Sequence, residues 1–219
     1  MNTVQFTPRA VVFDFDGTIV DTETPPFLCI QREYARFGLK LTREAWQHRL
    51  GRTDLRHWTV ELEEAVGQPL DREEIRVRVL SAKNRLTEDQ PVRPGIVGLI
   101  DRCKQFGLPL AVASSSAAEW VHPNLRARGL FDAFDAIVTR DAAIPSKPAP
   151  DSYLRACELL AVNPVDALAI EDSHNGLLAA RSAGLDCVIV PNPMTANMTF
   201  AGAAAVVSTA AEIELTIRR

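Results

Sequence analysis

The sequence lacks any apolar run that approaches the roughly 18 residues of a membrane-spanning helix. Its N-terminus also lacks a charged segment followed by a long apolar one, so no signal peptide is predicted. The four cysteines, Cys29, Cys103, Cys157 and Cys187, are widely spaced and form no CxxC pair. This spacing predicts neither a zinc site nor a disulfide framework, and we expect small buried cysteines in a reducing compartment. A cytoplasmic protein with no membrane partner is therefore expected.

An excess of positive charge is absent as well. The 219 residues carry 24 Lys and Arg against 28 Asp and Glu, a formal net charge of -4. This balance gives no electrostatic reason to expect nucleic acid or an anionic membrane as a partner. An anionic substrate would have to be attracted locally, by a few placed cations or by a metal ion.

Hydrophobic residues make up 47% of the chain, and the length fits one large domain or a domain with a small insert. From about residue 91 onward, short apolar segments alternate with helical patterns such as 151–160 and 176–183. Segments that are apolar throughout predict parallel strands covered on both faces. The predicted strands are 10–13, 108–113, 136–139, 167–170 and 187–191. The expected fold class is α/β, with a doubly wound, Rossmann-like core.

The segment 23–90 differs in composition, because it is rich in charged residues and helix formers and contains no convincing strand pattern. Asp71 followed by Glu74 is typical of a helix start. The helices predicted here are 27–37, 43–50, 54–66 and 71–86. We expect residues 1–22 and 91–219 to form the core and residues 23–90 to form a helical insert, with linkers at 22–26 and 91–95.

Polar side chains follow the predicted strands at the edge where ligands bind in open parallel sheets. Asp14 and Asp16 follow the strand at 10–13, and Ser114, Ser115 and Ser116 follow the strand at 108–113. Lys147 precedes a helix, and Glu171 and Asp172 follow the strand at 167–170. The sheet is therefore expected to bring four carboxylates, one ammonium group and a group of hydroxyls together.

Four carboxylates in one cleft repel one another unless a cation is bound. Mg²⁺ prefers oxygen ligands and would keep the carboxylates ionised, so that Asp14 can act as a nucleophile. Lys147 would offset the remaining negative charge and orient a phosphoryl group, and Ser114 near a helix N-terminus would bind a phosphoryl oxygen. Asp16 would act as general acid and base, and its carbonyl would be a metal ligand. The set predicts phosphoryl transfer on a small phosphorylated metabolite.

Each motif taken alone also has a structural interpretation. The pair Asp14 and Asp16 would suit a turn or a helix cap, and three consecutive serines are typical of helix N-caps. Lys147 would be a solvated loop charge, and Glu171 with Asp172 would favour a helix N-terminus through its dipole. Taken together the motifs indicate a site, because each follows an apolar strand or lies in the corresponding loop.

These residues resemble the motifs of the haloacid dehalogenase superfamily, in its phosphatase and phosphomutase branch with a small helical cap. The motifs, in the family's order, read DFDGT at 14–18, VASS at 112–115, Lys147 before Pro148, and IEDS at 170–173. The resemblance covers essentially the whole chain.

The resemblance implies a role for each motif residue. Asp14 would be the nucleophile, Asp16 the acid and base, and Ser114 and Lys147 the groups that bind the phosphoryl group. Mg²⁺ would be held by Asp14, the carbonyl of Asp16 and Asp172, with Glu171 acting through water.

The resemblance also implies substrate-binding positions. The sequence HRLGRT at 48–53 is similar to the substrate loop of the cap, which assigns Gly51 and Arg52 to the substrate. Thr18 and Ser115, within the motifs, are predicted to bind substrate too. The three tryptophans, Trp46, Trp58 and Trp120, are expected to serve packing.

Three positions depart from members that resemble β-phosphoglucomutase. Those members usually carry a His after the hinge and a Lys-Asn pair after the serines, whereas this chain has Pro26, Ala117 and Ala118. The missing groups help to grip a second phosphate, so their absence favours hydrolysis. The leading hypothesis is a monomeric Mg²⁺-dependent phosphatase acting on a small phosphorylated metabolite, in particular a sugar phosphate. The alternatives are a phosphomutase and, remotely, a signalling module phosphorylated on Asp.

Overall fold

The computed structural model describes residues 3–47, 49, 55–140 and 144–217 of the chain. The chain forms two compact units, Met1–Val20 with Pro91–Arg219 and Asp21–Gln90. Asp21 and Thr22, which the sequence assigned to the core, thus belong to the helical unit. The predicted substrate residues Gly51 and Arg52 lie outside the described residues.

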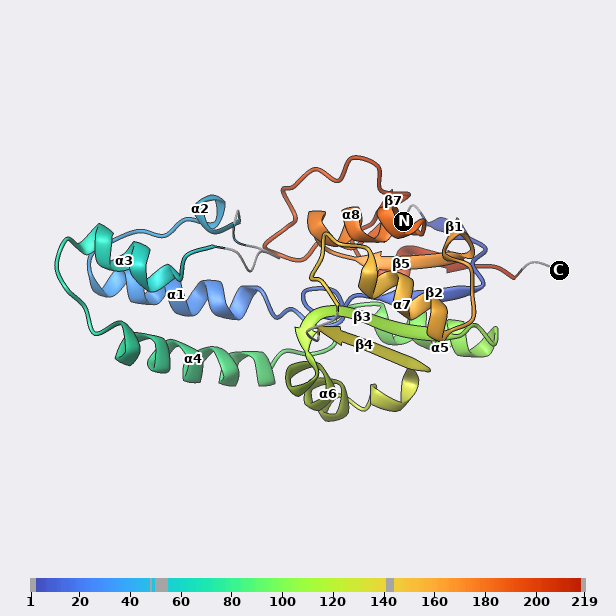
Figure 1. Cartoon of the computed structure of the whole chain (residues 1–219), viewed down its shortest axis with the longest axis horizontal. Coiled ribbons are helices and arrows are strands. Elements are labelled where there is room, and N and C mark those ends of the chain that lie inside the picture. Colours follow the sequence, from blue (N-terminus) through green and yellow to red (C-terminus); the bar gives the residue numbers. More distant parts are fainter. Residues whose placement is uncertain (1–2, 48, 50–54, 141–143, 218–219) are drawn as a thin grey trace. The chain divides into compact units, whose positions relative to one another are not determined.

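The first unit, hereafter the core unit, is built on a parallel six-stranded sheet with the order β4-β3-β2-β5-β6-β7 (Figure 1). The strands are β2 (Ala10–Phe13), β3 (Leu110–Ala117), β4 (Ala136–Arg140), β5 (Ala167–Glu171), β6 (Asp186–Ile189) and β7 (Ala205–Val206). The chain builds outward from β2 through β3 and β4, then returns to the other side of β2 at β5. Ligands bind beyond the carboxyl ends of the strands at such a switch point.

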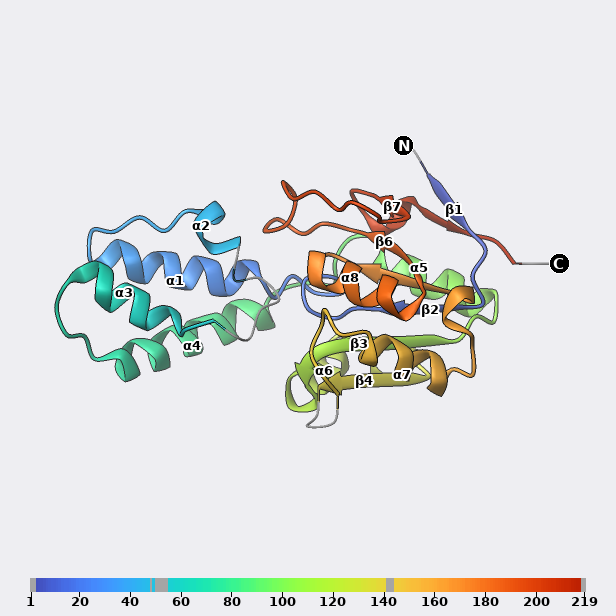
Figure 2. The ribbon, with the colours of Figure 1, turned by 45° about the horizontal axis from the view of Figure 1, so that its top comes forward.

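Helices cover both faces of this sheet (Figures 1 and 2). The helices are α5 (Ile96–Gln105), α6 (Ala118–Ala127), α7 (Asp151–Leu159) and α8 (His174–Ala183). Val11 and Phe13 of β2 share a core with buried residues of α5 and α6, and Ala10 and Val12 share one with residues of α7 and α8. Since successive strand residues point to opposite faces, a strand covered on both faces must be apolar throughout. The predicted doubly wound α/β fold is confirmed.

Several short elements of the core unit were not predicted. Strand β1 (Val4–Phe6) pairs in parallel with β8 (Ile213–Leu215) in a separate two-stranded sheet. The described residues also form the 3-10 helices η1 (Phe131–Ala133), η2 (Pro164–Asp166) and η3 (Ala210–Glu212). Two or three residues are too few to display a hydrophobic period, so sequence patterns do not predict such elements.

The second unit is helical. Its helices are α1 (Thr24–Arg36), α2 (Arg43–Gln47), α3 (Trp58–Val66) and α4 (Arg72–Glu88), and α4 contacts both α1 and α3. The buried carboxylate of Glu33 on α1 accepts two hydrogen bonds of 3.0 Å from the Arg78 guanidinium on α4. This two-point contact ties the two longest helices together.

The helix starts of this unit follow capping chemistry. Asp71 accepts a 2.9 Å hydrogen bond from the backbone N–H of Glu74, as predicted for the start of α4. Helix α1 begins at Thr24, inside the predicted linker, because its first turn accommodates proline at no cost in hydrogen bonds. The side chain of Asp21 accepts hydrogen bonds from the backbone N–H groups of Glu23 and Thr24.

The two ends of the core unit that flank the insert lie next to each other. Val20 forms an antiparallel bridge with Val92, and the backbone N–H of Arg93 donates to the Ile19 carbonyl at 2.9 Å. The Arg93 guanidinium donates to the carbonyl oxygens of Gly17 at 2.6 Å, Val190 at 2.8 Å and Pro191 at 2.7 Å. Arg93, just after the chain returns from the insert to the core unit, is therefore hydrogen-bonded to the loops that follow β2 and β6.

Within the described part of the chain, no helix is long and apolar enough to cross a membrane. All four cysteines are buried and free of disulfides, as expected. The cytoplasmic location and the monomeric state stay predictions.

The turn before α5 depends on glycine. Gly95 has φ +85°, and a Cβ there would overlap with the backbone nitrogen of Ala211. We expect Gly95→Ala to lower the free energy of unfolding by about 2–5 kcal/mol, because left-handed strain and a clash with rigid backbone combine. Gly107 is the matched control, since it has φ +65° but open space around it. Gly107→Ala should cost only about 1–2 kcal/mol. Urea denaturation measures both, and equal losses would contradict the predicted clash.

Candidate active site

The candidate site lies at the carboxyl ends of β2, β3 and β5. Asp14 directly follows β2, and its backbone N–H donates to the Ile170 carbonyl of β5 at 2.9 Å. Glu171 is the last residue of β5, and Asp172 follows it. Lys147 lies in the loop before α7, where its backbone N–H donates to the Ser115 hydroxyl at 3.1 Å. The four strand-end motifs predicted from the sequence thus lie together within the core unit.

One ammonium group joins two carboxylates at the centre of the site. Lys147 Nζ lies 2.6 Å from Asp14 Oδ1 and 2.6 Å from Glu171 Oε1. The three side chains are only 6%, 9% and 0% exposed. Glu171 Oε1 also accepts a 2.9 Å hydrogen bond from the Tyr153 hydroxyl. Since Tyr153 is fully buried and its pKa is raised by burial and by Glu171, its phenol stays neutral and donates.

Burial dominates the electrostatics of Asp14. It raises the pKa of Asp14 to about 8, against the lowering effect of Lys147 and with smaller contributions from Glu171 and Asp16. Burial lowers the pKa of Lys147, but Asp14 and Glu171 raise it by more, so that its ammonium stays charged. Burial therefore opposes the ionisation of Asp14, and a further cation near it would favour the ionised form.

The Asp172 carboxylate is held from both sides. Its Oδ1 accepts from the Thr18 hydroxyl at 3.2 Å and its Oδ2 from Asn192 Nδ2 at 2.5 Å. The Asn192 amide oxygen in turn accepts backbone N–H groups of Met194 and Thr195. Thr18 was predicted to bind substrate, but it is fully buried and its hydroxyl is directed at Asp172.

The close approach of the chain to Asp172 requires glycine at position 17. Gly17 has φ +83°, and an added Cβ would overlap with Asp172 Oδ2 and Asn192 Nδ2. No other residue fits this turn without displacing the carboxylate. The glycine of the DFDGT motif thus has a steric reason in this structure.

Asp16 faces a different set of groups. Its Oδ1 accepts from Trp120 Nε1 at 2.8 Å, and its Oδ2 accepts from the Ser116 hydroxyl at 2.6 Å and the Ser114 hydroxyl at 3.3 Å. The helix N-cap interpretation of the serines is wrong, because β3 runs through all three serines and the N-cap of α6 is Ala117. Extension of β3 places Ser114 and Ser116 on the same side of the strand.

Ser115 points elsewhere in the site. Its hydroxyl, which was predicted to bind substrate, accepts from the backbone N–H of Lys147 and so anchors the lysine loop. The second oxygen of Glu171, Oε2, accepts from the backbone N–H groups of Asp172 and Ser173 and from the Ser173 hydroxyl. Both Glu171 oxygens are therefore fixed by protein donors.

The residues present fit a divalent cation. Oxygens of Asp14, Glu171 and Asp172 all lie within 4.8 Å of one another. Asp14 Oδ2 is buried and has no hydrogen-bond partner among the described residues, an arrangement that costs free energy unless a cation binds there. Carboxylate oxygens are the ligands that Mg²⁺ prefers.

Sequence reasoning missed Trp120, Tyr153 and Asn192 as residues of this site, and it placed Ser116 among the strand-end hydroxyls without giving it a role. Trp120 was assigned to packing, and it does pack against the core, but its indole N–H also reaches Asp16. The only available signals were the position of Ser116 two residues after Ser114 and that of Asn192 just beyond a strand end. Neither residue type is diagnostic at such a place.

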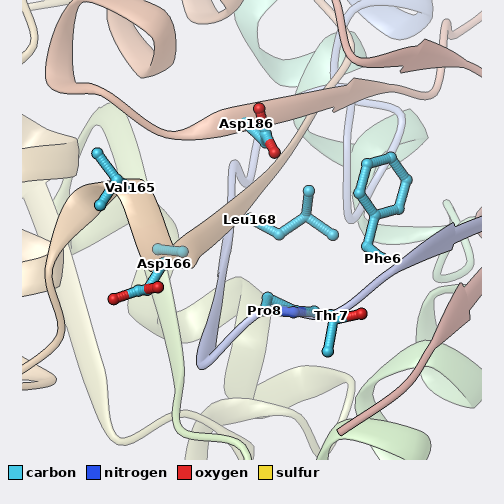
Figure 3. Close-up of a pocket in the computed structure, with 8 residues that line it drawn as sticks. Phe6, Thr7, Pro8, Val165, Asp166, Leu168 and Asp186 are labelled. Carbon is cyan, nitrogen blue, oxygen red and sulfur yellow. The ribbon is translucent and has the colours of Figure 1, made fainter. Parts of the chain in front are cut away.

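A hollow lies at the amino ends of the strands of the same sheet, opposite the candidate site (Figure 3). It has a volume of about 140 Å³ and lies where β2, β5 and β6 begin, whereas the carboxylates lie where β2 and β5 end. Its lining residues are Phe6, Thr7, Pro8, Val165, Asp166, Ala167, Leu168 and Asp186. None of the candidate site residues lines this hollow, so it is separate from the site.

The raised pKa of Asp14 predicts a pH-dependent stability in the absence of metal. Between the unfolded value near 3.8 and the folded value of about 8, the folded state retains a proton that the unfolded chain has lost. The stability contributed by this proton declines as pH rises through that range. We expect the wild-type Tm in EDTA to fall relative to that of Asp14→Asn by roughly 5–10 °C between pH 5 and pH 9.

Thermal unfolding followed by circular dichroism measures this difference, and Asp14→Asn is the control because an amide does not titrate. Added Mg²⁺ should restore the wild-type Tm at pH 8 and affect the variant less. A constant difference between the two proteins across this pH range would show that burial does not control Asp14.

Comparison with known proteins supports the fold and the resemblance seen in the sequence. Residues 8–184 match the family described as haloacid dehalogenase-like hydrolase. The chain is 37% identical to YhcW of Bacillus subtilis (strain 168) over 209 residues, covering 95% of each chain. It is 32% identical to hexitol phosphatase B of Escherichia coli (strain K12), covering 87% of this chain and 88% of that protein.

Solved structures agree with the sequence relatives. A crystal structure of CbbY from Rhodobacter sphaeroides in complex with phosphate has a TM-score of 0.73 and 32% identity, covering 94% of this chain and 96% of that one. The match extends over most of the chain, and the motifs lie together at one edge of the sheet. The resemblance seen in the sequence is confirmed, and this protein belongs to the haloacid dehalogenase-like hydrolase family.

Proposed function

We propose that this enzyme is a Mg²⁺-dependent phosphatase that hydrolyses a small sugar phosphate through an aspartyl phosphate on Asp14. The observation that carries the proposal is the Asp14 carboxylate, which is buried, 2.6 Å from a lysine ammonium, and has one oxygen without a partner among the described residues. A carboxylate in this state is costly to maintain unless it serves chemistry.

In the first half of the reaction, the Asp14 carboxylate attacks phosphorus and the bond to the leaving oxygen breaks. The electron pair of that bond goes to the leaving oxygen, which takes a proton from the Asp16 carboxyl group. The ammonium of Lys147 orients the nucleophile and offsets charge on the phosphoryl oxygens. The Ser114 hydroxyl donates to a phosphoryl oxygen once it turns away from Asp16.

In the second half, Asp16 takes a proton from water, and the resulting hydroxide oxygen bonds to phosphorus. The bond between phosphorus and the Asp14 oxygen breaks, which releases inorganic phosphate and regenerates the carboxylate. One side chain thus gives a proton in the first step and takes one in the second.

Mg²⁺, held by Asp14, Asp172 and the carbonyl of Asp16 with Glu171 acting through water, would keep the carboxylates ionised and stabilise negative charge on the phosphoryl group. Thr18 and Asn192 orient Asp172 for that role through their hydrogen bonds to its two oxygens.

Sugar phosphates are the substrate class that the relatives favour. One relative is named hexitol phosphatase B, and a mutant of CbbY was crystallised with Xylulose-(1,5)bisphosphate at 31% identity to this chain. Hydrolysis is favoured over a mutase reaction because Ala117 and Ala118, after the serines, offer no side-chain donor for a second phosphate.

Phosphate release from a panel of sugar phosphates and other phosphomonoesters, with Mg²⁺ or with EDTA, tests this function. We expect release to need Mg²⁺ and to fall by roughly 10⁴-fold or more in Asp14→Asn, because the covalent nucleophile is lost. Circular dichroism of the variant checks that its fold is intact.

Other outcomes contradict the proposal in distinct ways. Interconversion of sugar phosphate isomers without release of phosphate would make the enzyme a mutase. A phosphorylated Asp14 that persists for many minutes would favour a signalling role. Activity retained in Asp14→Asn would remove this residue as the nucleophile.

The cap assignment gives a separate prediction. We propose that Arg52, which lies outside the described residues, contacts the leaving part of the substrate. Arg52→Ala should change the ratios of kcat/KM between substrates by about tenfold or more, because a charge-assisted contact to some substrates is lost. Arg43→Ala is the matched control, since Arg43 is an exposed arginine of the same segment. Unchanged ratios in Arg52→Ala would remove the assignment.

A further inference from the structure

The environment of Asp16 differs from that of the other carboxylates of the site. Asp14 and Glu171 face an ammonium, and Asp172 faces an amide and a hydroxyl. Asp16 instead faces two serine hydroxyls and an indole, all provided by β3 and the first turn of α6. The proton-transfer residue is therefore positioned by a different part of the fold from the residues that hold charge.

The three donors are not chemically equivalent. A serine hydroxyl can donate or accept, and it rotates to suit its partner, whereas an indole N–H can only donate. Trp120 Nε1 lies 2.8 Å from Asp16 Oδ1, so this oxygen must always be the acceptor in the pair. Oδ2 faces the hydroxyls of Ser116 at 2.6 Å and Ser114 at 3.3 Å, which can adapt to either state of the carboxyl group.

The backbone explains why these donors converge. The pairing of β3 with β4 shifts register between Ala113 and Ala117, so the serine segment departs from the regular sheet at its end. Ser114 and Ser116 project to the same side because they are two residues apart in extended backbone. The backbone N–H of Ser116 also donates to the Ser114 hydroxyl at 3.0 Å, which fixes the two serines relative to each other.

We infer that Trp120 and Ser116 are positioning residues for proton transfer. Trp120 holds the Asp16 carboxyl group by Oδ1, and Ser116 orients Oδ2, which is the oxygen that exchanges the proton. This inference rests on the proposed function, in which Asp16 protonates the leaving oxygen. Trp120 acts through Asp16 and touches no reacting atom. Because the indole N–H occupies Oδ1, the proton is carried by Oδ2, which lies beside Ser114. The Ser114 hydroxyl is the proposed phosphoryl-binding group.

The inference predicts a dependence on the leaving group. An alkoxide leaves only with a proton from Asp16, whereas p-nitrophenolate leaves readily without one. Trp120→Phe removes the N–H and preserves most of the packing. We expect kcat/KM for a hexitol phosphate to fall by about 10–100-fold and that for p-nitrophenyl phosphate to change by less than about threefold.

Trp46→Phe is the matched control. Trp46 is a buried indole of the helical unit whose Nε1 has no hydrogen-bond partner within the described part of the chain, so its loss removes an N–H that orients nothing. This variant should leave the ratio of the two rates unchanged. Thermal unfolding of both variants shows whether the fold is intact.

Ser116→Ala provides a second test that stands if Trp120→Phe does not fold. It deletes the hydroxyl that donates to Oδ2 and buries no new group, so the same selective loss on the hexitol phosphate is expected. An equal loss on both esters in either variant would mean a general structural or phosphoryl-binding role and would overturn the inference. Unchanged rates on both esters would overturn it as well.

The wild-type enzyme separates failure of the inference from failure of the proposed function. If the wild type with Mg²⁺ hydrolyses neither ester, the phosphatase proposal is wrong and the inference falls with it. If it hydrolyses p-nitrophenyl phosphate but not a hexitol phosphate, the alkyl ester of the panel that is hydrolysed best replaces the hexitol phosphate. If no alkyl ester is hydrolysed, the positioning role is overturned while phosphatase chemistry stands.

Discussion

The ammonium of Lys147, shared at 2.6 Å between the buried carboxylates of Asp14 and Glu171, is the contact on which the site depends. Removing one partner from such a buried group leaves an uncompensated charge, which is among the most destabilising changes a protein can undergo. The neighbours of the three side chains reflect this constraint. Tyr153 and the backbone N–H groups of Asp172 and Ser173 satisfy the Glu171 oxygens, and Ser115 fixes the loop that carries Lys147.

The charge balance of the site remains negative after this contact is made. Asp16 and Asp172 lie nearby, and their carboxylate oxygens accept hydrogen bonds from hydroxyl, indole and amide groups, all of which are neutral. Neutral donors stabilise a carboxylate without cancelling its charge, so the site retains its attraction for a dication. Different parts of the fold therefore position the two sets of groups, because β5 and the lysine loop carry the ion pairs while β3 and α6 orient the carboxyl group of Asp16.

The sequence predicted the main fold and the strand-end carboxylates for one physical reason. Strands buried on both faces must be apolar throughout, so the polar residues that interrupt this pattern at Asp14 and Glu171 could be located without coordinates. The serines could not be assigned in the same way, because three serines suit a helix N-cap as well as a strand end. The serines belong to the strand because β3 pairs with β4 as far as Ala117 and Arg140. That contact joins residues far apart in the sequence, so local patterns do not reveal it.

The orienting residues were harder still to predict. The hydrogen bonds of Trp120 to Asp16 and of Asn192 to Asp172 join residues 104 and 20 positions apart, and they depend on side-chain direction as well as on the order of the strands. Helix α1 begins at Thr24, earlier than expected, because of local capping chemistry. The core unit ends at Val20, also earlier than expected, because Val20 forms a bridge with Val92.

The bridge between Val20 and Val92 also has an evolutionary consequence. Because it closes the base of the insertion point, the core meets any inserted segment at the same two adjacent residues, whatever the length of that segment. Inserts of different size or sequence can therefore be exchanged in evolution without a change in the strands and loops of the core unit.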